Sequence, residues 1–113
     1  MKQITEHSNL IFYIASSADS FKINEPIIII THASDLHLNL LEKNSSEIKL
    51  IVDIGGNLNK IIEKIKPYNH CIIEASGIIE AVNIVKLFKS PAKKVIYFNP
   101  ENEQEYKRAI LKN

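Results

Sequence analysis

The chain has 113 residues, of which 45% are hydrophobic, and its formal net charge is +1 at pH 7. This size supports one domain, residues 1–113, and the near-neutral charge argues against a dedicated nucleic-acid binder or a strongly acidic partner. Arg108 is the only arginine, which makes a phosphate site built from arginine forks a poor expectation. The single cysteine, Cys71, excludes an internal disulfide. With no signal-peptide pattern and no apolar window of transmembrane length, a cytoplasmic location is expected.

The first apolar run, residues 10–14, predicts a strand that follows a mostly polar segment. Residues 15–26 are polar and too short for a packed crossover helix. Residues 1–26 are therefore expected to form either an edge strand, paired antiparallel, or an arm that docks on another protein. Large apolar groups outside a core usually mark an interface. The candidate partner-binding residues are Ile4, Leu10, Phe12 and Tyr13.

Four further apolar runs, residues 27–30, 50–54, 71–74 and 95–98, are short and rich in β-branched residues. Such continuous runs, spaced by helix-like stretches, indicate parallel strands covered on both faces. The expected fold is α/β: a three-layer α/β/α sandwich with a mostly parallel, Rossmann-like or flavodoxin-like sheet. Cys71 falls inside one of these runs, so a buried, inert thiol is expected there. The order of the strands stays open.

Two helices are predicted between the first three of these four strands. Ser34 can cap a short helix that ends at Glu42. The next helix has apolar residues at i, i+3, i+4 and i+7, one stripe that is expected to face the sheet. The stripe consists of Leu58, Ile61, Ile62 and Ile65.

The helix that opens after Ser76 and Gly77 is apolar on more than one side. Its inward positions are Ile79, Val82, Val85 and Phe88, with Ile78, Ile84 and Leu87 beside them. Such a broad apolar surface indicates either deep burial or a partner on the second side of the helix.

Asn99, Pro100 and Glu101 form a helix start for the last element of the chain. This helix is expected to pack Tyr106 and Ile110 inward. On its outer side Glu103 and Lys107 are spaced for an i,i+4 ion pair.

Polar residues follow three of the predicted strands, at the edge where open α/β sheets bind ligands. The possible ligand edge consists of Asp53, Gly55, Gly56, Glu74, Ser76 and Asn99. Asp53 and Glu74 are the types of residue that form an acid/base or metal pair. The competing interpretation is that polar residues at strand ends turn the chain and cap helices. Because no complete phosphate-binding or catalytic motif is present, we expect no catalytic residue, metal or cofactor, and enzymatic activity is the less favoured option.

An ordered set of short motifs resembles the psi subunit of bacterial DNA polymerase III holoenzyme. Ile4 and the apolar run with Phe12 resemble its N-terminal segment. Its main strand and the following helix start resemble residues 27–30 and 34–36, and the lead-in to a later strand resembles residues 69–71. The last part of its chain resembles Ser90-Pro91, Asn99-Pro100 and residues 107–111. The resemblance implies a non-catalytic adaptor in DNA replication that bridges the chi subunit and the clamp loader. It implies protein partners of those two kinds, without direct nucleic-acid or membrane contact.

A second resemblance leaves an alternative function open. Residues 84–110 resemble the end of a STAS domain, which has an apolar helix, a short strand and a helix after Asn99-Pro100. That family's phosphorylatable segment is missing, since Asp53 is followed by Ile54, Gly55 and Gly56. The alternative is a small-ligand-binding or STAS-like regulatory domain that uses the carboxyl edge of the strands.

Overall fold

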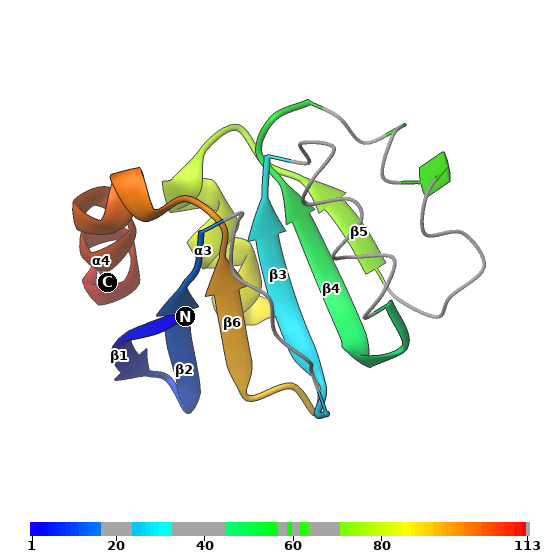
Figure 1. Cartoon of the computed structure of the whole chain (residues 1–113), viewed down its shortest axis with the longest axis horizontal. Coiled ribbons are helices and arrows are strands. Elements are labelled where there is room, and N and C mark those ends of the chain that lie inside the picture. The colour runs from blue at the N-terminus through cyan, green and yellow to red at the C-terminus, as the bar shows by residue number, and fades with distance from the viewer. Residues whose placement is uncertain (17–23, 33–44, 57–58, 60–61, 64–70, 113) are drawn as a thin grey trace.

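The computed structural model describes residues 1–16, 24–32, 45–56, 59, 62–63 and 71–112. These residues form a six-stranded sheet with two α-helices and two short 3-10 helices (Figure 1). The strands are β1 (Lys2–His7), β2 (Leu10–Ile14), β3 (Ile27–Thr31), β4 (Ile48–Asp53), β5 (Cys71–Glu74) and β6 (Lys94–Tyr97). The helices are η1 (Ser45–Glu47), α3 (Ile78–Leu87), η2 (Pro100–Asn102) and α4 (Glu103–Leu111). No helix in this part of the chain is long and apolar enough to cross a membrane.

The sheet is mixed, with the strand order β1-β2-β6-β3-β4-β5. β1 and β2 are antiparallel, whereas β2 and β6, β6 and β3, β3 and β4, and β4 and β5 are parallel pairs. The prediction of an α/β fold is confirmed. The parallel arrangement of β3, β4, β5 and β6, expected from their continuous apolar runs, is confirmed as well.

The prediction that residues 10–14 form a strand that pairs antiparallel is confirmed, since β2 is antiparallel to β1, but its placement at the edge of the sheet is wrong. β2 lies between β1 and β6 and runs parallel to β6. Since β3 is also parallel to β6, residues 15–26 connect two parallel strands that flank a third. This connection has about the dozen residues that a parallel crossover requires. The length of the segment is therefore compatible with a parallel crossover, which its polar composition did not indicate.

β1 is the edge strand, and the sequence did not reveal it. Its residues are exposed or half-buried, so the strand lacks an apolar run. His7 pairs with Leu10 across a two-residue turn, in which Ser8 has φ 54° and Asn9 has φ 66°. Positive φ at both central positions is the geometry of a type I′ hairpin, which matches the twist of the strands. The dipeptide is not the usual Asn-Gly, so the turn gave no clear sequence signal.

α3 and α4 cover one face of the sheet and close the larger core. α3 buries four side chains and α4 buries three against it. On the sheet side this core contains Phe12, Ile14, Ile28, Ile30, Leu50, Val52, Val95 and Tyr97. The helices contribute Ile78, Ala81, Val82, Val85, Tyr106, Ala109 and Ile110. The inward positions predicted for Tyr106 and Ile110 are confirmed.

The opposite face of the sheet carries a second buried cluster. Along β3, Ile28 and Ile30 point to the helices, while Ile27 and Ile29 belong to the second cluster. All four are at most 1% exposed, which explains why this strand reads as an unbroken apolar run. The second cluster also contains Ala15, Ile48, Ile51, Ile96 and Phe98.

Three local predictions are wrong. Ile62 is 40% exposed, so it does not lie in the core; Leu58, Ile61 and Ile65 lie outside the described residues. Cys71 is exposed, because it begins the edge strand β5. Glu103 does not pair with Lys107, since its carboxylate lies 3.1 Å from Nζ of Lys2 on β1.

The predicted helix from Ser34 to Glu42 lies entirely outside the described residues. The helix starts predicted near Gly77 and Asn99 are confirmed. Gly77 is the N-cap of α3, and Asn99 precedes η2, which leads directly into α4.

The core position of Phe12 gives a direct test of the fold. Phe12→Ala is expected to lower the free energy of unfolding by about 3–5 kcal/mol, because it removes a fully buried ring and leaves a cavity. The matched control is Leu87→Ala, at a side chain that is 82% exposed, with an expected change within about 0.5 kcal/mol. Urea denaturation measures both. Equal effects of the two substitutions would contradict the placement of β2 inside the sheet.

Candidate functional site

The carboxyl ends of three neighbouring strands bring Thr31, Asp53 and Glu74 into line. Thr31 is the register partner of Asp53, and Asp53 is the register partner of Glu74. Thr31 and Asp53 are fully buried, whereas Glu74 is exposed. Asp53 and Glu74, the predicted carboxylate pair, therefore lie on adjacent strands, one buried and the other exposed to solvent.

Asp53 participates in the turn that follows its own strand. Its Oδ1 accepts a hydrogen bond of 3.0 Å from the backbone N–H of Gly55. Gly56 has φ 72°, a conformation that a side chain rarely permits. A short aspartate that bonds the backbone two residues on, followed by a glycine, is an Asx turn. Asp53, Gly55 and Gly56 thus form one local structure that reverses the chain.

Ser76 faces the start of α3. Its backbone N–H and its Oγ both donate to the carboxylate of Glu80, at 3.4 and 3.0 Å. A carboxylate that reaches back from the first turn to the chain before it stabilises a helix N-terminus, as in a capping box. The contacts of Ser76 are therefore those of a helix start.

The hydroxyl of Tyr97 joins the ends of β6 and β3. The side-chain amides of Asn99 and Asn102 donate to it at 3.3 and 3.0 Å. Nε2 of His32, the residue after β3, lies 3.4 Å from the same oxygen. Asn99 does not cap the following helix with its side chain, because its amide is directed to this hydroxyl instead.

Tyr106 connects α4 to the same region through its ring. Its centroid lies 4.9 Å from that of Tyr97 and 6.1 Å from that of Phe12, in an edge contact with the latter. Its hydroxyl donates a hydrogen bond of 3.0 Å to the backbone oxygen of Tyr13 on β2. Burial of the hydroxyl raises the pKa of Tyr106, and the nearby Tyr97 raises it further. We call the three rings of Phe12, Tyr97 and Tyr106 the aromatic cluster.

The structure therefore brings the six residues of the predicted ligand edge to one end of the sheet, but into separate local contacts. Asp53, Gly55 and Gly56 share a turn with Glu74 in register beside it, Ser76 bonds Glu80, and Asn99 bonds Tyr97. Among the described residues, no group of three or more His, Cys, Asp or Glu side chains is placed to hold a metal ion.

The N-terminal candidates for partner binding are closer to the core than expected. Phe12 is fully buried in the larger core, so its predicted role in partner contact is wrong for the folded chain. The physical reason is that β2 is covered by α4 on one side and flanked by strands on both edges. Ile4, Leu10 and Tyr13 are half-buried, and they pack against the two clusters.

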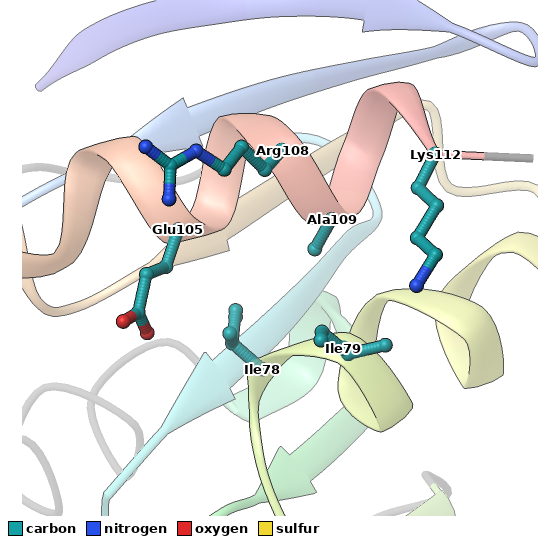
Figure 2. Close-up of a pocket in the computed structure, with 6 residues that line it drawn as sticks. All are labelled: Ile78, Ile79, Glu105, Arg108, Ala109 and Lys112. Atoms are coloured by element: carbon teal, nitrogen blue, oxygen red, sulfur yellow. The ribbon is translucent and has the colours of Figure 1, made fainter.

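A groove that the sequence did not indicate lies between α3 and α4 (Figure 2). It is open and has a volume of about 390 Å³. The lining residues are Ile78, Ile79, Glu105, Arg108, Ala109 and Lys112. Ile78 and Ala109 are nearly buried, whereas Ile79 is 53% exposed. The apolar base of the groove is thus continuous with the core below it.

The charged groups stand at the margin of this groove. Figure 2 shows Glu105 and Lys112 extending from α4 toward α3, with Ile78 and Ile79 on the facing helix. A shallower hollow on the outer side of α4 shares Arg108 and Lys112 with the groove. It is completed by Gln104, Lys107 and Leu111.

The one sequence signal for the groove was the apolar second side of α3. Ile79 and Leu87, both expected to pack inward or beside the inward stripe, are 53% and 82% exposed. The residues from α4 carried no such signal, because their role depends on where the two helices lie relative to each other.

Comparisons with models of protein families, with curated protein sequences and with solved structures find no match to this chain.

The raised pKa of Tyr106 predicts a specific pH dependence of stability. The folded state keeps this phenol neutral, while an unfolded tyrosine ionises near its ordinary pKa of 10.0. Above that pH the unfolded state releases a proton that the folded state retains. The stabilising contribution is therefore complete below about pH 10 and decreases at higher pH, by up to about 1.4 kcal/mol per pH unit.

Tyr106→Phe removes this titration together with the hydrogen bond to Tyr13, which is worth about 1 kcal/mol. Urea midpoints measured from pH 8 to 11 should show wild type more stable at pH 8, with the difference shrinking toward pH 11. A constant difference across this range would mean that the hydroxyl ionises as freely in the folded state as in the unfolded one.

Proposed function

We propose that this chain is a non-catalytic adaptor that binds other proteins. The observation that supports it is the exposed apolar side of α3 beside an open groove, with Ile79 at its centre. Protein interfaces typically combine an apolar base with a charged or polar rim, and the groove between α3 and α4 has this composition.

The binding free energy expected from covering Ile79 is that of a specific but local contact. Full burial of an isoleucine side chain is worth about 1.5–3 kcal/mol, so covering the exposed half of Ile79 contributes about 1 kcal/mol. The groove, at about 390 Å³, has room for a few partner side chains. Stable binding then also requires the polar rim and additional area around the groove.

We propose, on the resemblance to the psi subunit, that the partners are a chi-like subunit and a clamp-loader subunit in the cytoplasm. A bridging adaptor needs two surfaces, of which the groove is one. The second surface proposed is the hairpin of β1 and β2, where Ile4, Leu10 and Tyr13 are half-buried at the edge of the sheet. The exposed free thiol of Cys71 is consistent with a reducing compartment.

We also propose that the complete chain is a three-layer sandwich with a Rossmann-like or flavodoxin-like arrangement. Its support is the second buried cluster, which includes Ile29, Ile51 and Ile96 on the face away from α3 and α4. A sheet face made mainly of isoleucine is stable only when another layer covers it.

A second candidate function, a small-ligand-binding or STAS-like regulatory domain, is favoured by one specific observation. β3 and β6 are neighbours, but the chain leaves β3 toward β4 and leaves β6 toward α4. Ligands in open α/β sheets bind where connections diverge in this way, and His32, Asn99 and Asn102 meet at Tyr97 between these two strands.

A thermal-shift screen with nucleotides, divalent metals and phosphosugars distinguishes the two candidates. If the adaptor proposal is correct, no compound raises the melting temperature, because the polar groups at the carboxyl edge of the sheet are hydrogen-bonded within turns and helix starts. A reproducible increase that Asp53→Asn abolishes would replace the adaptor proposal with a ligand site.

The adaptor proposal predicts that Ile79→Gln abolishes capture, from native lysate, of the one partner (chi-like or clamp-loader) that binds the groove, while the partner of the β1–β2 hairpin is still captured. Leu87→Gln is the matched control, since Leu87 is an exposed apolar residue of the same helix that does not line the groove. Both variants should keep the wild-type circular dichroism spectrum. Mass spectrometry of the captured proteins gives the result, and unchanged capture by Ile79→Gln would count against the groove as the binding surface.

A further inference from the structure

Positive charge is concentrated around the groove between α3 and α4. The linings of the groove and of the adjoining hollow contain the basic residues Lys107, Arg108 and Lys112 and the acidic residue Glu105. Their formal sum is +2 (three minus one), although the whole chain carries only +1. A surface of this sign attracts carboxylates and repels basic segments.

The two cations at the junction of the hollows are available for a partner. Arg108 and Lys112 are exposed, and within the described part of the chain neither side chain forms an ion pair or a hydrogen bond. Lys86 of α3 differs, because its ammonium group donates to the backbone oxygens of Ile110 and Lys112 at the end of α4. Arg108 is also the only arginine of the chain, and its planar fork matches a carboxylate better than a lysine does.

We propose that the groove binds an acidic segment of a partner protein that also carries apolar side chains. An apolar side chain of the segment packs on Ile78, Ile79 and Ala109, and its carboxylates bind Arg108 and Lys112. Arg108 lies on α4 and Lys112 is the C-cap residue that follows it, four positions later, so the two residues stand about one helical turn apart beside the groove. Two acidic residues with a similar separation, as on one face of a helical segment, match them. This inference rests on the proposed adaptor function and specifies the chemistry of its partner.

The lining favours such a segment over a nucleic acid. Among the residues that the structure describes, no aromatic side chain lines either hollow, whereas sites for single-stranded nucleic acid stack bases on aromatic rings. The apolar side chains of Ile78, Ile79 and Ala109 also offer phosphates no hydrogen bonds. An oligonucleotide is accordingly a control ligand for the test.

The test uses a displayed library of random 12-residue peptides selected on the full chain. The enriched peptides should combine Asp or Glu with Leu, Ile or Phe. Arg108→Gln should weaken binding of these peptides by about tenfold, the loss of one charge-assisted contact, and added salt should weaken wild-type binding. Lys93→Gln is the matched control: it removes the same charge from an exposed residue outside the groove, and binding should change less than about twofold.

The possible failures are distinguishable. Enriched peptides that are neutral or basic, acidic peptides whose binding is insensitive to Arg108→Gln, or tighter binding of a mixed-sequence oligonucleotide would overturn the acidic-segment inference. If Ile79→Gln abolishes binding of those enriched peptides, the groove still binds protein segments and the adaptor proposal is retained. No enrichment of any peptide over a blank surface would overturn both. Melting curves of each variant exclude unfolding as the cause of lost binding.

Discussion

The position of α4 depends on the burial of Tyr106. Its ring lies against Tyr97 of β6 and Phe12 of β2, and its hydroxyl bonds the backbone of β2. A fully buried aromatic side chain contributes several kcal/mol, whereas the exposed ion pair of Lys2 with Glu103 contributes at most about 1 kcal/mol. The aromatic cluster, and not the surface charges, therefore sets the position of α4. The groove between the helices exists because α4 is held there, beside α3.

The polar residues of the chain divide into two groups with different consequences. At the carboxyl end of the sheet, Asp53, Ser76 and Asn99 each have a hydrogen-bond partner that orders a turn or a helix start. At the groove, the charged side chains of Arg108 and Lys112 stand beside apolar residues and have no such partner among the described residues. The first group stabilises the fold, and the second is the one that a partner protein can use.

The sequence predicted those features that depend on local pattern. The strands β3, β4 and β6 were found because strands buried on both faces are continuously apolar, and the short edge strand β5 was found because it is also rich in isoleucine. β1 was missed because its exposed side chains leave no such run and its Ser8-Asn9 turn is an uncommon one. The place of β2 inside the sheet was missed because the polar sequence of residues 15–26 has no helical pattern that would indicate a crossover. The groove was not predictable, since residues from α3 and α4 meet there only after both helices pack on the sheet.

The central claim, that the groove between α3 and α4 is a protein-binding surface, can be tested most directly by photocrosslinking in the cells that produce the protein. A photoreactive amino acid is placed at Ile79 in the groove, at Leu87 on the same helix or at Glu74 on the exposed carboxyl edge. We expect a discrete crosslinked protein from position 79 and none from positions 87 and 74. A crosslinked partner from position 74 with none from position 79 would contradict the claim and would place the functional surface at the carboxyl edge of the sheet.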